Sequence, residues 1–513
     1  MPVMRATNKL EESASGKMTG FIPPDPAEET AMSHLDIRSA IRPDPDQAMV
    51  DIANYVVDYQ VESPEALATA RYMLLDSLGC AMLAMKHPEC VKHLGPLVPG
   101  ASLPGGVRVP GTSFELDPVQ AAYNIGVQVR WLDFNDTWLA AEWGHPSDNL
   151  GAILAVGDYL SRKAAREGGK PVLVRDVLEA AIKAHEIQGG YALKNSFNRV
   201  GLDHVILVRL ASTAVATRML GGGKEEIINA VSHSWIDGGA LRTYRHAPNA
   251  GPRKSWAAGD ACRRAVIHAL NAVKGCVGYP SALSAKTWGF YDVAFKGKAF
   301  EFERPFGSYV MENVLFKISY PAEFHAQTAV ECAMQLHPEV VGRLDQIDRV
   351  DVETQEAGVR IIDKTGPLAN YADRDHCLQY MIAVPMIFGR LTADDYGDAV
   401  AADPRIDALR GKMVVVENPG FTADYFDPDK RFIGNSIQVH FTDGTSTRKV
   451  SIDYPIGHRK RRVEGVPVLL NKFAAALAGH LPAHRVRQIL DLTADNDRLE
   501  ATPIHQLLDL FVV

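Results

Sequence analysis

Residues 131–148 concentrate the groups of this chain that are best suited to move protons. Asp133 and His145 both lie in this stretch. An imidazole with a pKa near ~6.5 takes up and returns protons at neutral pH, and a neighbouring carboxylate fixes its tautomer and raises its basicity. Gly144 and Pro146 indicate a loop, and acid-base groups commonly sit on loops. We therefore expect acid-base catalysis here.

A simpler interpretation makes Asp136 and Asp148 helix caps and His145 an ordinary loop residue. We favour a catalytic site, because so many polar groups gather between two apolar helical segments. Thr137 follows Asp133 by four residues. Both side chains would share one face if the preceding helix continued through them, and His145 would then meet them.

Positive charge comes from two other segments. Residues 242–256 contain four cations, including Arg245 and Lys254, in a loop that bears Pro and Gly. Such a loop is suited to bind an anion, although a solvated surface turn has the same composition. Residues 316–325 place Lys317 at the junction of two sequence patterns, where ligand clefts are common.

His204 directly precedes a long apolar helical run. A single His in this position is more often a capping or core residue than a catalytic one. We include it as a candidate beside that structural alternative.

Several other chemistries lack their sequence signatures. Residues 221–224, Gly-Gly-Gly-Lys, have neither the spacing nor the Ser or Thr of a phosphate-binding loop, and no Gly-x-Gly-x-x-Gly follows a strand. The Gly-x-Ser-x-Gly elbow of serine hydrolases is missing too. Asp133, His145 and nearby aspartates could surround a divalent ion, but no second His in the stretch supports this. We expect no metal and no cofactor.

The composition is that of an ordinary globular protein. Of 513 residues, 46% are hydrophobic and 23% charged, and no run approaches the ~18 apolar residues of a membrane span. The net charge of -8 argues against general attraction to nucleic acid. We expect the basic run at 458–462 to be a solvated turn at a domain boundary.

The six cysteines are scattered, without a Cys-x-x-Cys pair. This pattern predicts free thiols in a reducing cytoplasm. It also lacks the closely spaced ligands of an iron-sulfur dehydratase.

Apolar periodicity predicts the elements that position these residues. Helices are expected at 64–82, 118–129, 149–160, 174–187, 205–220, 224–236 and 260–273. Further on, strand patterns at 344–354, 412–417, 437–441 and 448–453 alternate with helices at 324–337, 376–390 and 404–411. Asp443-Gly444 marks a hairpin, and helices return at 466–477 and 483–492.

These elements predict a mainly α protein with an α+β second domain. Residues 1–41 are expected to form a poorly ordered N-terminal extension. Residues 42–312 form the first part of a helical domain, residues 313–460 the α+β domain, and residues 461–513 a helical segment that packs back on the helical domain.

Several segments resemble one known family. Trp-Leu-Asp-Phe-Asn-Asp-Thr-Trp at 131–138 and Gly-His-Pro-Ser-Asp-Asn at 144–149 resemble the signature region of the MmgE/PrpD family. The match runs from about residue 42 to the C-terminus. The segments most similar to the branch that removes water from 2-methylcitrate are 71–80, 203–212, 253–260 and 317–325. Residues 138–144 also resemble that branch, with a longer spacing than in the related cis-aconitate decarboxylases.

The resemblance implies a discontinuous all-helical domain with a smaller α+β lid. It also implies a homodimer, and lyase chemistry on a tricarboxylate without a metal or cofactor. The family's active-site positions carry over, where the motifs match, to Asp133, Thr137, His145, His204, Lys254 and Lys317.

The implied reaction converts 2-methylcitrate to 2-methyl-cis-aconitate, a step of propionate catabolism. The α-proton is weakly acidic, so we expect Lys254 and Lys317 to stabilise the enediolate-like transition state. His145, oriented by Asp133, and His204 are expected to exchange the protons. The residues expected to bind the substrate are Thr137, Arg245, Tyr320 and His325.

Three alternatives stay open. The closest is a decarboxylase or hydratase for cis-aconitate or citrate, because one methyl group provides only ~1–3 kcal/mol of discrimination. A metal-dependent hydrolase built on the aspartates of residues 131–148 is more distant. The third is a non-catalytic helical protein that binds carboxylates.

Overall fold

The computed structural model describes residues 40–237, 239–246 and 248–513. The expected N-terminal extension, residues 1–41, lies outside the described residues except for Ala40 and Ile41. Contacts divide the chain into Met1–Pro43 and Asp44–Val513. Every described helix and strand lies in the second unit.

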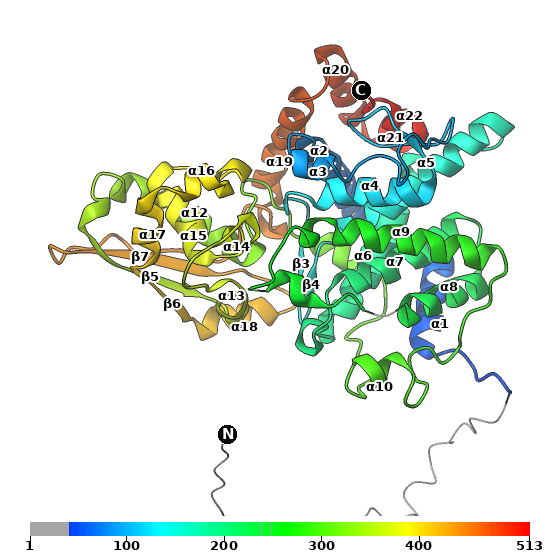
Figure 1. The fold of residues 1–513 in the computed structure, drawn as a ribbon, viewed down its shortest axis with the longest axis horizontal. Helices are drawn as coiled ribbons and strands as arrows, with labels where there is room; N and C mark the ends of the chain where they lie inside the picture. Colours follow the sequence, from blue (N-terminus) through cyan, green and yellow to red (C-terminus); the bar gives the residue numbers. More distant parts are fainter. Residues whose placement is uncertain (1–39, 238, 247) are drawn as a thin grey trace, which may run out of the picture. The chain divides into compact units, whose positions relative to one another are not determined.

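Long helices surround one large apolar core in the first part of this unit (Figure 1). They are α1 (Gln47–Asp58), α2 (Pro64–Ala84), α4 (Pro118–Arg130), α5 (Leu150–Glu167), α6 (Val174–Lys194), α7 (Val205–Met219), α8 (Lys224–Ile236) and α9 (Arg253–Val273). The shorter elements between them are α3 (Pro88–Val91), α10 (Phe290–Ala294), α11 (Tyr309–Asn313), β1 (Val107–Arg108), β2 (Glu115–Leu116), β3 (Trp138–Leu139) and β4 (Trp143–Gly144).

Helix α2 begins where its sequence signals place it. The Ser63 hydroxyl accepts from the backbone N–H of Ala66 at 3.2 Å, and Pro64 occupies the first helical position. Helix α9 begins at Arg253, earlier than the predicted residue 260. Lys254 therefore lies in the first turn of a helix and not in a loop.

Glycines allow three helices to approach closely beside residues 131–148. A Cβ added at Gly126 of α4 would lie 2.8 Å from the Cα of Gly259 in α9. One added at Gly151 of α5 would lie 2.9 Å from the Cα of Gly126. Larger side chains would force the helices apart. This contact therefore fixes both ends of the loop that carries the acid-base residues.

A four-stranded sheet forms the second part, with the order β6-β5-β7-β8. The strands are β5 (Ile347–Thr354), β6 (Met413–Glu417), β7 (Asn435–Phe441) and β8 (Val450–Ile452). Only the β5–β6 pair is parallel. Buried Val350 and Val352 of β5 belong to the second apolar core.

Helices α12 (Gln327–Val340), α15 (Leu378–Phe388) and α17 (Pro404–Arg410) pack over this sheet (Figure 1). Short helices α14 (Tyr371–Arg374) and α16 (Asp398–Ala401) lie in their connections. Helices α13 (Glu356–Ile362) and α18 (Pro419–Phe426) lie near the end of the sheet that meets the helical part. A small apolar cluster joins Ala357 and Tyr425 of these two helices to Leu139 and Trp143 of the helical part.

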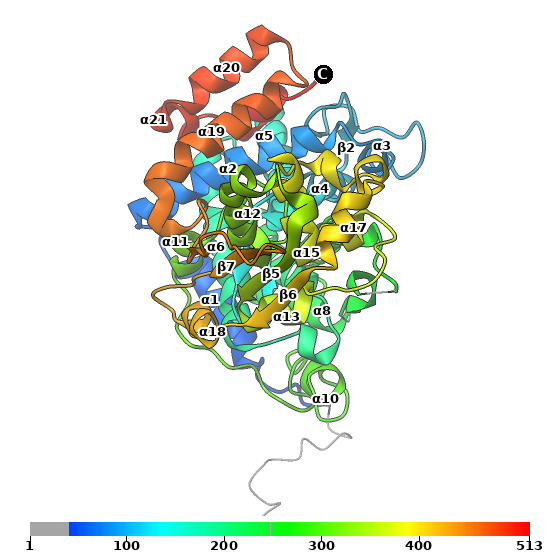
Figure 2. The ribbon, with the colours of Figure 1, turned by 90° about the vertical axis from the view of Figure 1, so that its left-hand side faces the viewer.

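The C-terminal helices return to the first core. Helix α19 (Arg462–Ala478) packs along α2, as Figure 2 shows, and it buries Leu469 and Phe473 there. Beyond it follow α20 (Ala483–Thr493), α21 (Asn496–Glu500) and α22 (Ile504–Asp509). The helical part is therefore discontinuous in sequence.

The prediction of a mainly α fold with a smaller α+β part is confirmed. For the domain limits we propose a first boundary between Ile318, in the first core, and Ala322, in the second. We propose a second boundary between Ile452 and Ile456, which pack against different cores. Among the described residues, no helix has the length and apolar character needed to cross a membrane.

Candidate active site

Asp133 lies beyond the end of helix α4. The helix ends at Arg130, so the expectation that Asp133 and Thr137 share a helical face is wrong. Asp133 is buried and adopts a φ of 50°, in the left-handed region. This conformation is costly for a residue other than glycine and is found preferentially at functional sites. The chain turns sharply here and projects the carboxylate into the interior.

A small hairpin then brings Thr137 and His145 together. Strands β3 and β4 pair with Trp138 opposite Gly144, so their flanking residues become neighbours. The Thr137 hydroxyl lies 3.4 Å from His145 Nδ1. His145 Nδ1 also lies 2.6 Å from the carbonyl oxygen of Asp136. A carbonyl only accepts, so Nδ1 carries the hydrogen and Nε2 presents a lone pair.

Asp133 is the anionic centre of the site. Its Oδ1 lies 3.0 Å from a guanidinium nitrogen of Arg130 and 3.4 Å from His145 Nε2. The Lys317 ammonium donates to the Asp133 carboxylate and, at 2.8 Å, to its backbone oxygen. Burial by itself raises the pKa of Asp133, but Arg130 and Lys317 outweigh it and hold the pKa well below its usual range. Asp133 is therefore an ionised anchor for cations.

Two other carboxylates of residues 131–148, those of Asp136 and Asp148, stabilise the shape of the loop. The Asp136 carboxylate accepts from the backbone N–H of Ser147 at 2.9 Å and lies 2.8 Å from His185 Nε2. Asp148 accepts from the Asn135 amide at 2.9 Å. Burial raises the pKa of Asp148 to about 7. The loop is thus held by its own polar groups around the acid-base residues.

His145 and His204 face one another with ring centroids 6.0 Å apart. Burial lowers the pKa of both imidazoles well below the usual value; Arg130 lowers that of His145 further, and Asp203 opposes the shift at His204. Neither ring nitrogen of His204 forms a hydrogen bond within the described residues. Two neutral imidazoles therefore stand together, one with both nitrogens available to a ligand.

The two arginines of the turn Arg242–Arg245 differ in how many of their donors are already bound within the protein. Arg245 binds Asp203 through Nε and, at 3.2 Å, through a terminal nitrogen. Arg242 stacks 5.1 Å over the ring of Trp143, and its nearest contact with Asp203 is 3.6 Å. Its Nε and one terminal nitrogen are buried without a hydrogen-bond partner in the described chain. Arg242, more than the predicted Arg245, has donors left for an anion.

Lys254 reaches the α+β part. It donates to Asp375 Oδ1 at 2.7 Å and lies 3.2 Å from His376 Nδ1. Burial lowers its pKa, and Asp375 opposes that shift. Its ion pair joins the first turn of α9 to the segment before α15. The contact of Lys317 with Asp133 likewise joins the start of the domain junction to the loop that follows α4.

Two of the predicted substrate-binding residues lie outside the cavity. Tyr320 packs against the second apolar core. His325 Nδ1 lies 2.8 Å from a Glu323 carboxylate oxygen, and its Nε2 is 3.4 Å from the Tyr425 hydroxyl. Glu323 itself lines the cavity, so His325 acts on the site only through it.

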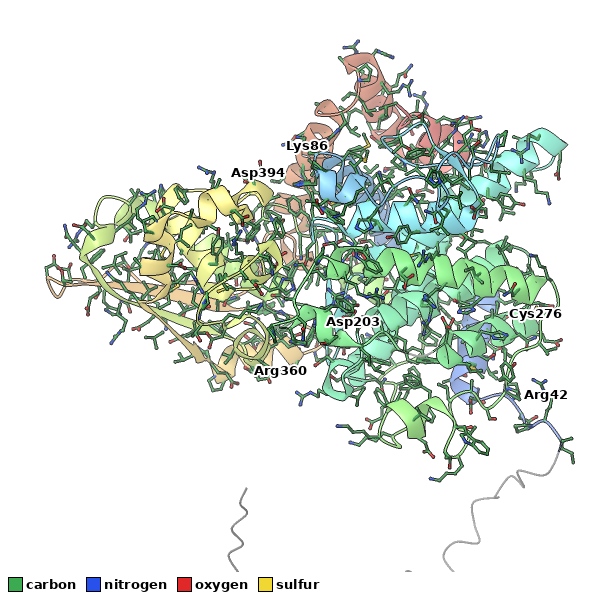
Figure 3. The ribbon with its side chains drawn as sticks, viewed as in Figure 1. Arg42, Lys86, Asp203, Cys276, Arg360 and Asp394 are labelled. Atoms are coloured by element: carbon green, nitrogen blue, oxygen red, sulfur yellow. The ribbon has the colours of Figure 1, made fainter. Side chains whose placement is uncertain are left out.

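One narrow cavity lies between the helical part and the α+β part, and many of these groups line it. Figure 3 marks Asp203 on the helical side and Arg360 on the other. The space open to water is about 30 Å³, room for about two water molecules. The residues that line it are Arg130, Asp133, Thr137, Leu139, Trp143, His145, His204, Arg242, Arg245, Lys317, Glu323, Phe324, Ile361 and His376.

Lys472 of α19 holds together two segments beside this cavity, those of Phe134 and Lys317. Its ammonium donates to the backbone oxygens of Phe134 and Lys317, each at 2.8 Å. It also lies 2.8 Å from Asp76 Oδ1. Three distant parts of the chain are thereby held at the site.

Sequence reasoning missed Arg130, Arg242, Glu323, Asp375 and His376. One signal was present for the last two: the dipeptide Asp-His stands before an apolar helix at 375–376 as it does at 203–204. Arg130 also gave a signal, because it is the one charged residue of α4 and stands at the end of the helix next to the polar loop.

Asp133, Asp375 and His376 hold ligand atoms within 4.8 Å of one another, a grouping that could bind a metal ion. Lys317 and Lys254 already donate to the two carboxylates. The negative charge of this group is therefore balanced by ammonium groups.

The arrangement gathers cations, carboxylates and two neutral imidazoles around one cavity, in a discontinuous helical protein with an α+β domain. The family model of the MmgE/PrpD N-terminal domain matches residues 50–303, and that of the C-terminal domain matches residues 320–497. The chain belongs to the MmgE/PrpD family, as its sequence motifs predicted.

Three relatives carry the name 2-methylcitrate dehydratase. The chain is 61% identical over 476 residues to 2-methylcitrate dehydratase of Salmonella typhimurium, covering 92% of this chain and 99% of that protein. It is 60% identical to 2-methylcitrate dehydratase of Cupriavidus necator, covering 93% and 99%. It is 58% identical to the mitochondrial 2-methylcitrate dehydratase of Yarrowia lipolytica, covering 92% and 91%.

Proposed function

We propose that this protein is a 2-methylcitrate dehydratase, a hydro-lyase that removes water from 2-methylcitrate to give 2-methyl-cis-aconitate. The observation that carries the proposal is the meeting of Lys317, Asp133 and His145 in one buried cavity. The identity of about 60% to bacterial 2-methylcitrate dehydratases over nearly the whole chain supports it.

The proton step needs a neutral base beside the substrate. His145 is suited to this step, because its Nδ1–H donates to the Asp136 carbonyl and leaves the Nε2 lone pair exposed. His204 provides the complementary step, protonation of the leaving hydroxide. Its neighbour Asp203, 3.6 Å from Nδ1, favours the protonated imidazole once an anionic substrate is bound.

Removal of the α-proton adds negative charge to a carboxylate, and the cations of the cavity stabilise that charge. Lys317 and Arg130 flank the Asp133 side of the cavity, and Arg242 offers its free donors from the opposite loop. Thr137 is placed to donate a hydrogen bond to a substrate carboxylate. Lys254 adds positive charge behind Asp375 and His376.

The proposal has further parts that rest on the family alone. They are a homodimer, a reaction that needs no metal or cofactor, and a place in propionate catabolism through the methylcitrate cycle. A cytoplasmic location is proposed from the scattered free cysteines. One relative carries the word mitochondrial in its name, so this location differs among relatives.

Decarboxylation of cis-aconitate, or the interconversion of citrate and cis-aconitate by loss or addition of water, is the second candidate. These substrates and 2-methylcitrate each carry three carboxylates, and the same cations of the cavity would bind them. The relatives from Salmonella, Cupriavidus and Yarrowia are all dehydratases of 2-methylcitrate, which favours the first proposal.

The test follows the absorbance of the conjugated product after 2-methylcitrate is added to chelator-treated protein. We expect turnover that chelation leaves unchanged. Release of carbon dioxide from cis-aconitate without dehydration of 2-methylcitrate would instead select the decarboxylase. Loss of activity on chelation, with recovery on adding a divalent metal, would overturn the metal-free mechanism.

A further inference from the structure

One part of the cavity lining is apolar, although most of the lining is charged or polar. Leu139 of β3, Phe324 before α12 and Ile361 of α13 form this part, the apolar wall. Leu139 and Phe324 are 3% and 1% exposed, and Ile361 is half-buried. All three belong to or pack against the same small apolar cluster.

Other apolar residues pack with this apolar wall. Leu315, Ala357, Tyr425 and Ile433 belong to the same cluster and do not line the cavity. Trp143 also lines the cavity, but Arg242 and Arg360 lie 5.1 and 5.3 Å from its ring. The wall therefore has a fixed position, and its free surface in the cavity is supplied by Leu139, Phe324 and Ile361.

The groups shared by citrate and 2-methylcitrate do not call for such a surface. Three carboxylates and a hydroxyl bind through cations and hydrogen-bond donors, which the polar residues of the lining supply. The one group by which 2-methylcitrate differs is an uncharged methyl. That methyl is attached to the carbon that loses its proton, so any surface that holds it must lie beside the proton acceptor. The apolar wall and His145 line the same narrow space.

We propose that Leu139, Phe324 and Ile361 bind the methyl group of the substrate and make the site specific for 2-methylcitrate over citrate. This inference rests on the proposed dehydratase function. Contact with the wall excludes water from the methyl and turns the neighbouring C–H bond toward the imidazole. Both effects raise kcat/KM for the methylated substrate and leave citrate without them. One methyl group in an apolar pocket gives roughly 10- to 200-fold discrimination.

The test compares kcat/KM for 2-methylcitrate and citrate in the wild-type protein, Ile361→Ala and Leu139→Ala. Val359→Ala is the matched control, because Val359 lies on the same helix, is also half-buried and is not part of the cavity lining. We expect each wall variant to lower the ratio of the two values by about tenfold or more. The control should change the ratio less than twofold.

Each outcome separates the two proposals. A wild-type protein that does not dehydrate 2-methylcitrate overturns the function and the wall together. An active wild-type protein whose substrate ratio is unchanged in Ile361→Ala overturns the wall alone. Ile361 is half-buried, so its truncation is better tolerated than that of Leu139 and keeps the test valid if Leu139→Ala fails to fold. A third variant, Ile361→Phe, fills the space for the methyl and should lower turnover of 2-methylcitrate more than that of citrate.

Discussion

Lys317 donates hydrogen bonds to both the backbone oxygen and the carboxylate of Asp133, across 184 residues of sequence. The same carboxylate lies 3.4 Å from His145 Nε2. One buried ion pair therefore positions a cation and a base on the same ligand cavity, and it depends on the left-handed turn at Asp133.

Breaking this pair should affect activity and stability in different ways. Lys317→Met is expected to lower kcat by about 100-fold or more, because a donor to the developing charge is lost. It should also lower the free energy of unfolding by ~3–5 kcal/mol, because Asp133 is left buried with one cation fewer. Denaturant unfolding and steady-state kinetics measure both.

The double variant Asp133→Asn with Lys317→Met separates the two effects. It should regain part of the lost stability, because one charge of each sign is then removed and the net charge of Asp133, Arg130 and Lys317 returns to its wild-type value, and it should stay inactive. A double variant no more stable than Lys317→Met alone would show that the pair is not a coupled unit.

His145→Gln should lower turnover by roughly 100-fold or more with the fold intact, the usual size of an acid-base contribution. His484→Gln is the control, because His484 is exposed on α20. Kinetics with 2-methylcitrate and a circular dichroism melt compare the two. Turnover of His145→Gln close to that of the control would remove His145 from the mechanism.

Arg242 and Arg245 should respond differently to the same substitution. Arg242→Gln removes unused donors from the cavity and should raise KM by about 10- to 100-fold with little change in melting temperature. Arg245→Gln breaks the buried pair with Asp203 and should instead destabilise the fold by ~3–5 kcal/mol. Equal changes in KM and melting temperature for both variants would contradict this division.

Asp148 predicts a pH dependence of stability. Burial raises its pKa from 3.8 to about 7 in the folded protein, so the folded state holds a proton that the unfolded state has lost. The contribution of Asp148 to the free energy of unfolding is therefore greatest below its unfolded pKa. It decreases by ~1.4 kcal/mol per pH unit as the pH rises from there toward about 7.

Asp148→Asn cannot ionise, so its stability relative to the wild type should be greater at pH 8 than at pH 5. Denaturant unfolding of both proteins at the two pH values measures the difference. A constant difference would show that Asp148 keeps an ordinary pKa. The conservative change also retains an acceptor for the Asn135 amide.

The features that sequence could predict are those that local chemistry fixes. Ser63 and Pro64 start α2, and Asp443-Gly444 lies in the turn between β7 and β8, because caps and tight turns depend on neighbouring residues. The family and the dehydratase function, which the resemblance implied, and the mainly α fold are confirmed by the family models and the relatives. The roles of the site residues stay predictions.

Side-chain direction in irregular segments was not predictable in the same way. Tyr320 shares a short segment with Lys317, yet it packs on the second core while Lys317 reaches Asp133. Arg245 is expected to bind substrate, yet two of its nitrogens donate to Asp203. Such choices depend on which partners the folded chain brings close, and a single sequence does not contain those distances.

The contacts of Lys472 have a consequence for how the protein becomes active during its synthesis. Helix α19 emerges from the ribosome after every residue that lines the cavity, yet its lysine fastens the carbonyl groups of Phe134 and Lys317. A nascent chain that ends before α19 therefore carries all the reactive side chains without the clamp that aligns them. Activity should appear only after α19 has been synthesised.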